Sequence, residues 1–227
     1  MKRGFPILAI ITALLLSFAL YEALIVAPTE QTMGNVQRIF YYHVPSAWTA
    51  FLLFAINFVA SILYLIKRSE KADILALVSA EVGVVFCTVV LITGPIWARP
   101  VWGIWWTWDL RLTLTLVLWL IYVSYLLLRR FSTGGKTPVI AAVVAIFGAL
   151  DVPLVYFSIW FFRTQHPSPV IGGGGSLDPR MAHVLLINWA AFLCLAWLLC
   201  WTRYELEVAE RRVEESHAME SLMEGSR

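Results

Sequence analysis

Charged side chains are scarce in this sequence, and their scarcity excludes several classes of protein. Asp, Glu, Lys and Arg make up 14% of the 227 residues and 60% are hydrophobic, against roughly 45–50% apolar residues in soluble domains. The net charge of +2 is small and scattered along the chain, whereas nucleic-acid-binding proteins cluster basic residues on one face. The composition therefore predicts an integral membrane protein that contacts membrane lipids and binds no nucleic acid.

Cysteine is also rare, and the motifs that carry cysteine or phosphate chemistry are missing. Cys87, Cys194 and Cys200 fall inside apolar runs without a Cys-x-x-Cys pair, which excludes a disulfide framework and covalent attachment of a cofactor to this chain. We expect these cysteines to pack between helices as small apolar side chains. Gly134-Gly135-Lys136 is only a fragment of a phosphate-binding Gly-x-x-x-x-Gly-Lys loop, so any ATP would have to be bound by a partner.

Six apolar stretches are long enough to cross a bilayer, which takes about 20 residues per helix. They are Pro6–Val26, Ser46–Ile66, Ile74–Gly94, Leu112–Leu128, Pro138–Trp160 and His183–Trp201. The expected fold class is an all-α integral membrane protein, in which residues 1–227 form a single membrane domain. The first stretch follows Lys2 and Arg3 as a signal peptide would, but it is long enough to span, so we expect it to remain as the first helix.

Basic residues mark alternate flanks of these stretches and so predict the topology. Under the positive-inside rule, both termini lie in the cytoplasm. The outer loops are then residues 27–45, 95–111 and 161–182, and residues 203–227 form a cytoplasmic tail. The outer loops contain no lysine, and we interpret their few arginines as partners for anions, because guanidinium groups bind carboxylates in a planar fork.

Some charged residues lie in unusual or paired positions away from the outer loops. Glu81 and Asp151 fall inside apolar runs, where an ionisable side chain is costly, so we expect each to be paired, protonated or directed into the bundle. In the tail, Glu207 and Arg211 have the i,i+4 order that favours a helical ion pair. We expect a structural role for Glu81 and Asp151. For the tail, a solvated helix end and a docking site explain the pattern about equally well.

The outer loop over residues 95–111 holds five tryptophans beside charged residues. Its candidate binding residues are Trp97, Arg99, Trp102, Trp105, Trp106, Trp108, Asp109 and Arg111. A membrane-interface belt places only a tryptophan or two at a helix end, whereas this density indicates a platform on which a large flat molecule can stack. Arg99 and Arg111 could pair with carboxylates at the edge of that molecule. A crowded interfacial belt is the alternative interpretation.

Each of the other two outer loops carries a histidine that follows aromatic residues. His43 precedes Pro45, which is expected to start the second helix, because proline suits a first helical turn. His166 precedes Gly172–Gly175, a run predicted to act as a mobile tether. His183 competes with His166 for the second position, and spacing alone does not choose between them.

Two imidazoles, an indole-rich platform and several arginines on one face of the membrane together match the needs of haem. Iron takes axial nitrogen ligands, the macrocycle stacks on aromatic surfaces, and the propionates pair with guanidinium groups. We therefore expect haem b as the bound cofactor. His43 is one expected metal ligand, and His166 or His183 is the other.

The Trp-rich motif is also characteristic of a family. It stands here as Trp102-Gly-Ile-Trp105-Trp106-Thr-Trp108-Asp109, and it accompanies the element Tyr41-Tyr-His43-Val-Pro45. Both resemble the CcmC family of system I cytochrome c maturation, a branch of the wider WWD-domain group of haem-handling proteins. The resemblance covers all six spans.

This resemblance implies roles for individual residues. His43 would be the first axial ligand, and His166 would be the second, because it ends Thr164-Gln165-His166 where the family has Thr-Leu-His or a close variant. Glu30 and Arg38 would act in handing haem to a partner, and Arg38 is also a candidate haem contact. The family's glutamine between them is Met33 in this sequence.

The implied function is to hold haem at the outer, periplasmic surface of the cell inner membrane and to present it to the haem chaperone CcmE. Relatives work in an ABC-type complex with the ATP-hydrolysing pair CcmA and CcmB and the small subunit CcmD. The chain would then be a haem-delivery subunit and not an enzyme. Two alternatives stay open. A haem translocator would need a polar path through the bundle, and a cytochrome c synthase would need more room for a protein substrate than the short outer loops offer.

Overall fold

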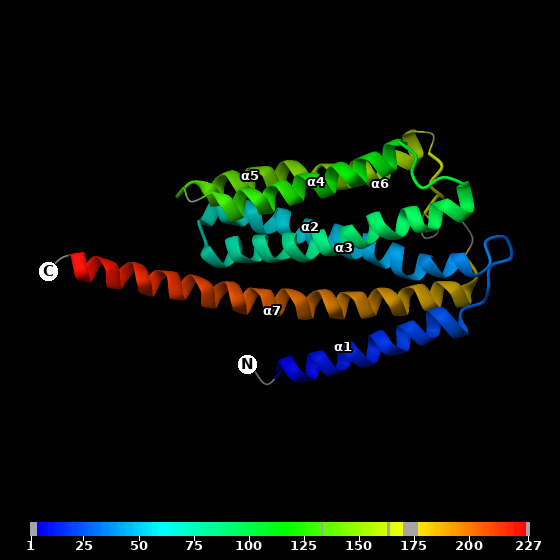
Figure 1. Ribbon diagram of the computed structural model, residues 1–227, viewed down its shortest axis with the longest axis horizontal. Helices are drawn as coiled ribbons and strands as arrows, with labels where there is room; N and C mark the ends of the chain where they lie inside the picture. The colour runs from blue at the N-terminus through cyan, green and yellow to red at the C-terminus, as the bar shows by residue number, and fades with distance from the viewer. Residues whose placement is uncertain (1–3, 133, 163, 170–176, 226–227) are drawn as a thin grey trace.

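The computed structural model describes residues 4–132, 134–162, 164–169 and 177–225, and this part of the chain is almost entirely helical (Figure 1). Six of its helical segments are long and apolar enough to cross a membrane, which confirms the predicted all-α fold. In chain order the elements are α1 (Gly4–Tyr21), the π-helix η1 (Glu22–Val26), the 3₁₀ helix η2 (Asn35–Ile39), α2 (Phe40–Lys67), α3 (Glu70–Trp102), α4 (Leu110–Phe131), α5 (Thr137–Ala149), α6 (Asp151–Phe161) and α7 (Pro179–Gly225).

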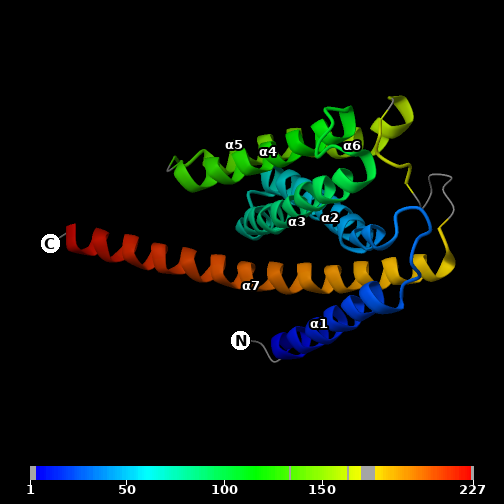
Figure 2. The same cartoon turned by 45° about the vertical axis from the view of Figure 1, so that its right-hand side comes forward.

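The helices form a bundle with α2 and α3 side by side at its centre. α1 and α7 lie on one side of this pair, and α4, α5 and α6 lie on the other (Figures 1 and 2). Residues 27–34, 103–109 and 164–169 connect helices at one end of the bundle, which we call the loop end. Both chain termini point toward the opposite end, which we call the tail end. The three segments that were expected to share a membrane face therefore do lie together.

An aromatic layer holds α2, α3 and α4 together in the middle of the bundle. Phe54 stacks on Tyr122 with ring centroids 3.8 Å apart, and Tyr125 is buried beside Tyr122. A Cβ atom at Gly83 would lie 2.7 Å from Phe54 Cε1, closer than non-bonded carbon atoms pack. Glycine at this position lets the two helices approach, as small residues do between membrane helices. The free thiol of Cys87 belongs to the same buried cluster, as its expected packing role requires.

α2 begins five residues before the proline that was expected to start it. Its first residue is Phe40 and Pro45 lies inside it, so the prediction that Pro45 begins the helix was wrong. The 3₁₀ helix η2 runs directly into α2, so the helix is already formed when it reaches the proline. Pro45 lacks an N–H and forfeits only the helical bond to the Tyr41 carbonyl. His43 therefore lies in the first turn of a helix and not on a loop before it.

α3 also continues through prolines where the sequence predicted a loop. It runs past Pro95 and Pro100 and ends at Trp102, although each proline removes one helical hydrogen bond. Packing along the helix offsets this loss, because the rings of Trp97 and Trp102 meet edge to face with centroids 5.2 Å apart. Gly103 then ends the helix with a φ of 80°, a left-handed conformation that glycine adopts without strain. About half of the predicted loop is therefore helix.

The fifth predicted span is two helices, and the sixth span and the tail are one. α5 ends at Ala149 and α6 begins at Asp151, because the ring of Pro153 would clash with the Ala149 carbonyl in a continuous helix. Asp151 is buried, and its Oδ2 has no hydrogen-bond partner among the described residues. α7 runs without a break for 47 residues, about 70 Å. The predicted tail is thus a helical continuation of the last span.

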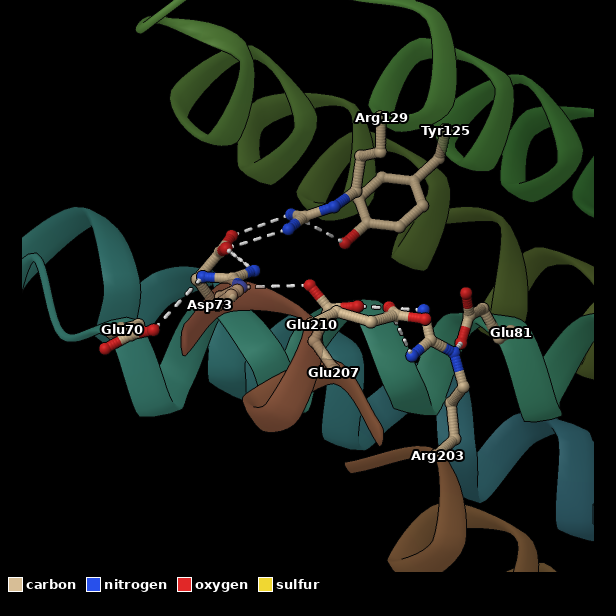
Figure 3. Close-up of polar contacts among 9 residues, drawn as sticks. Glu70, Asp73, Glu81, Tyr125, Arg129, Arg203, Glu207 and Glu210 are labelled. Atoms are coloured by element: carbon tan, nitrogen blue, oxygen red, sulfur yellow. Dashed lines mark hydrogen bonds and ion pairs between the residues drawn. The ribbon is translucent and has the colours of Figure 1, made fainter. Parts of the chain in front are cut away.

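Buried ion pairs tie α7 to α3 and α4 at the tail end (Figure 3). Asp73 on α3 accepts hydrogen bonds from both Nη atoms of Arg129 on α4, at 2.7 and 2.8 Å. The same carboxylate accepts a hydrogen bond of 2.7 Å from Arg211 on α7. Arg211 also donates to Glu207 at 2.9 Å, which confirms the expected i,i+4 pair. One buried carboxylate therefore joins three helices.

Glu81, one of the two acidic residues inside the predicted spans, is paired in the same region. Its carboxylate lies 2.8 Å from Nε of Arg203 on α7, and Arg203 also pairs with Glu207 at 2.8 Å. The charge inside the bundle is thus neutralised by a neighbouring helix, as the cost of an ionised group in a membrane requires.

Replacing Asp73 with asparagine should lower the thermal midpoint of the purified protein by about 6–20 °C. The buried guanidinium group of Arg129 would lose its counter-charge, which typically costs about 3–5 kcal/mol, and each kcal/mol shifts the midpoint of a chain of this length by about 2–4 °C. Glu220 is the control, because its carboxylate is exposed beside His217. Glu220→Gln should change the midpoint by less than about 2 °C. An unchanged midpoint for Asp73→Asn would contradict a stabilising role for this ion pair.

Candidate functional site

A cavity of about 690 Å³ lies at the loop end, between α2, α3, α4 and α6 and the loops that join them. Its size is within the roughly 300–1,000 Å³ of typical small-molecule pockets. The predicted binding residues that lie on its wall are Glu30, His43, Trp97, Trp102, Trp106, Arg111 and His166. The fold thus brings residues from all three predicted outer loops into one site.

The two histidines that the sequence singled out face each other across this cavity. His43 comes from the first turn of α2 and His166 from the loop after α6. Their ring centroids are 6.3 Å apart, and the ring planes are tilted by 33°. Bonds between imidazole nitrogen and a metal are about 2 Å long, so two imidazoles bound to opposite sides of one metal ion have ring centres about 6 Å apart. The spacing fits a single metal ion with two axial ligands.

Each of these imidazoles uses Nδ1 for a hydrogen bond, which leaves Nε2 for a ligand. His43 Nδ1 lies 2.8 Å from Thr93 Oγ1, and His166 Nδ1 lies 2.9 Å from the Pro167 carbonyl oxygen. Burial, together with the positive charge of Arg111, lowers the pKa of His166 to about 4. His166 is therefore neutral near pH 7, the form that binds a metal.

The five tryptophans divide into two groups. Trp97, Trp102 and Trp106 lie on the cavity wall, and the indole Nε1 of Trp106 is buried without a hydrogen-bond partner among the described residues. Trp105 and Trp108 are 59% and 76% exposed and do not line the cavity. The ring of Trp108 meets that of Trp106 at a centroid distance of 5.8 Å.

The charged residues of the Trp-rich segment also differ in position. Arg111, in the first turn of α4, lines the cavity, and its Nη1 is buried without a hydrogen-bond partner in the described part of the chain. Asp109 caps α4 by accepting from the Leu112 N–H at 3.1 Å, so it helps to place Arg111. Arg99 is exposed, bonds the Gly103 carbonyl and lies off the wall. Of the two arginines in this segment, Arg111 is therefore the one available to an anionic group inside the cavity.

The loop between α1 and α2 borders the cavity, and hydrogen bonds of its charged residues to nearby backbone groups hold its conformation. Glu30 lies on the wall, and its carboxylate accepts the backbone N–H of Met33, which also lines the cavity. Arg38 donates to the carbonyls of Ala23 and Ala27, at 2.7 and 3.2 Å, and does not line the cavity. Glu30 could reach a ligand or a partner at the cavity, whereas Arg38 holds the loop to η1.

The structure separates the competing histidines and adds residues that the sequence did not indicate. His183 is exposed on α7 and does not line the cavity. The Gly172–Gly175 run lies outside the described residues. Tyr156 lines the cavity and Thr93 lies behind His43. If the third helix had been predicted to continue to Trp102, the sequence would have placed Thr93 on the same helical face as Trp97, one turn before it.

Comparisons with known proteins show which family the chain belongs to. A family model described as heme exporter protein C matches residues 1–219. Heme exporter protein C of Bradyrhizobium diazoefficiens is 34% identical over 222 residues, which cover 96% of this chain and 84% of that protein. Heme exporter protein C of Escherichia coli strain K12 is 31% identical over 192 residues, 84% of this chain and 78% of that protein. A putative cytochrome c biosynthesis ccmC-like mitochondrial protein of Marchantia polymorpha is 31% identical over 182 residues, 80% of this chain and 78% of that protein.

Proposed function

Because the chain belongs to the heme exporter protein C (CcmC) family, we propose that it binds haem in the loop-end cavity and delivers it for cytochrome c maturation. Haem is the cargo of this protein, and the residues on the cavity wall hold it between arrival and release. The observation that carries the proposal is the pair His43 and His166, whose rings lie 6.3 Å apart across the cavity. Two imidazoles at this spacing can bind haem iron from both faces.

The rest of the wall suits the other parts of a haem molecule. Trp97, Trp102 and Trp106 supply aromatic surface for the macrocycle. The unpaired Nη1 of Arg111 needs an anionic partner, and a propionate satisfies it with a charge-assisted hydrogen bond. Bound haem b would supply an iron that takes two axial nitrogen ligands, a flat apolar ring and carboxylates at one edge, and this wall offers a partner for each.

The loop end is proposed to face the periplasm across the cell inner membrane. The connections at the tail end carry the basic residues Lys67, Arg68, Lys71, Arg129 and Arg130, and positively charged flanks stay in the cytoplasm. Haem held at the loop end would then be presented to the periplasmic chaperone CcmE. The proposed contacts for that partner are Glu30 and Arg38. Glu30 lines the cavity, and Arg38 donates a hydrogen bond to the Ala23 carbonyl.

An ABC-type complex with CcmA, CcmB and CcmD is the proposed setting for this delivery. The sequence has no complete phosphate-binding loop, so the proposed source of ATP hydrolysis is a partner. Delivery is favoured over translocation by two observations: the 690 Å³ cavity is at the loop end, and Glu81 is held in an ion pair with Arg203. The short loops, residues 27–34 and 103–109, disfavour a synthase that binds a protein substrate.

Titration of the purified protein with haem tests the proposed platform. Trp106→Ala should weaken haem binding about 10-fold, because the indole on the cavity wall would be lost. Trp108→Ala is the matched control, since this indole is exposed and lies off the wall, and its affinity should stay within about 2-fold of wild type. Equal haem affinity for wild type and Trp106→Ala would instead support an interfacial aromatic belt.

A further inference from the structure

Thr93 on α3 makes a cross-helix hydrogen bond to His43 whose direction can be assigned. The Thr93 hydroxyl lies 2.7 Å from the Val89 carbonyl oxygen and 2.8 Å from His43 Nδ1. A carbonyl only accepts, so the single hydroxyl proton of Thr93 is donated to Val89. The hydroxyl oxygen must then accept the proton of His43 Nδ1–H. This contact therefore selects the tautomer of His43 that has its lone pair on Nε2.

We infer that Thr93 is a positioning residue for haem, whose hydroxyl fixes the tautomer and the orientation of His43 so that Nε2 is offered to the iron. The inference rests on the proposed function, because it assumes that His43 is an axial ligand. Groups that accept the second ring proton of a ligating histidine fix the orientation of the ring and raise its basicity. Thr93 is the residue in the described structure that does this for His43.

The two histidines differ in the hydrogen bond that each makes through Nδ1. The partner of His43 is on a neighbouring helix, 50 residues away in sequence, whereas the partner of His166 is the carbonyl of the next residue, Pro167. A bond to the adjacent residue moves with the loop, but a bond between α2 and α3 holds the ring to the centre of the bundle. Thr93 thus makes His43 the retained ligand and leaves His166 as the ligand that can detach during handover.

The electronic consequence distinguishes this role from simple packing. An Nδ1–H that donates to an oxygen makes the imidazole a stronger donor to iron, and a stronger donor stabilises the ferric state. Loss of the Thr93 hydroxyl should therefore raise the reduction potential of bound haem as well as weaken its binding. A residue that merely packed behind the ring would change the affinity without this shift in potential.

Thr88, a little more than one turn earlier on α3, provides a matched control. Its hydroxyl donates to the Val84 carbonyl at 2.8 Å and accepts from Trp119 Nε1 at 2.8 Å. The arrangement is the same as at Thr93, but the group it holds is an indole outside the cavity wall. Valine at either position removes one hydroxyl and conserves shape, and the helical backbone bond to the i−4 carbonyl remains.

The test compares Thr93→Val, Thr93→Ser and Thr88→Val, each purified in full length and loaded with haem. Thr93→Val should weaken haem binding about 10–100-fold and raise the reduction potential, while Thr93→Ser and Thr88→Val should match wild type in both. An unchanged potential in Thr93→Val overturns the inference, and so does an equal effect of Thr93→Val and Thr88→Val.

The variant His43→Ala separates this inference from the proposed function. If His43→Ala keeps the wild-type haem spectrum, His43 is not a ligand and the proposed site itself is wrong. If His43→Ala loses that spectrum and Thr93→Val keeps both affinity and potential, the site stands and the role of Thr93 is wrong. Loss in both variants with rescue in Thr93→Ser is the result that the inference predicts.

Discussion

Alanine at His43 or at His166 should abolish the six-coordinate spectrum of bound haem, whereas alanine at His183 should leave it unchanged. His43 and His166 face each other across the cavity at a centroid distance of 6.3 Å, so each would supply one axial nitrogen. His183 is exposed on α7 and away from the cavity wall. The measurement is the optical spectrum of each purified variant after loading with haem, in the ferric and the ferrous state.

Added imidazole provides the control for this experiment. In His43→Ala and His166→Ala the removed ring leaves space on the cavity wall, and free imidazole should fill it and restore a six-coordinate spectrum. A variant that had simply misfolded would not respond to imidazole. Loss of the spectrum in His183→Ala with its retention in His166→Ala would contradict the assignment of the second ligand.

Replacing Arg111 with glutamine should weaken haem binding about 10–150-fold. The guanidinium group is mostly enclosed by the wall and has an unpaired Nη1, so a propionate there would form a hydrogen bond between charged groups, worth about 1.5–3 kcal/mol. Arg99→Gln is the matched control, because Arg99 belongs to the same Trp-rich segment but is exposed and off the wall. Its affinity for haem should stay close to that of wild type.

Haem dimethyl ester, in which both propionates are neutral, identifies the reason for the loss. Wild type and Arg111→Gln should bind the ester with nearly equal affinity, because the charged partner of Arg111 has been removed from the ligand. If Arg111→Gln weakens the binding of haem and of its ester to the same extent, Arg111 acts on the shape of the cavity and not on a carboxylate.

Hydrophobicity alone predicted the spans and the gathering of the three outer loops. Runs of about 20 apolar residues have few alternatives to a membrane helix, and successive spans cross the membrane in alternating directions, so every second connection lies on the same face. The same reasoning placed His43, His166 and the Trp-rich segment at one end of the bundle, where the structure has them. The distance between the two imidazoles depends on how α2 and the loop after α6 are placed relative to each other in the bundle, which no local pattern encodes.

Helix boundaries were predicted less well, because Pro45 was interpreted as a helix start and the third span was expected to end at Gly94. Pro45, Pro95 and Pro100 all lie inside helices, since each removes only one backbone bond while side-chain packing continues on both sides. Trp97 and Trp102 were therefore predicted to lie in a loop, whereas both lie in α3. Thr93 was missed for a different reason, because its role depends on a contact with His43 on a neighbouring helix.

The ion pairs of Asp73 could not be predicted from the sequence either. Arg129 and Arg211 come from α4 and α7, and the sequence did not indicate that either would pair with Asp73. Their convergence on one carboxylate depends on how three helices pack at the tail end (Figure 3). Local order did predict the pair Glu207 and Arg211, because both lie on one helix at i,i+4 spacing.

A density map of the haem-loaded protein, at a resolution that shows side chains, tests the central claim most directly. The account predicts planar density inside the loop-end cavity, with iron bonded to Nε2 of both His43 and His166 and a propionate against Arg111. Haem density outside the cavity, against the exposed faces of Trp105 and Trp108, or iron bonded to His183, would contradict it.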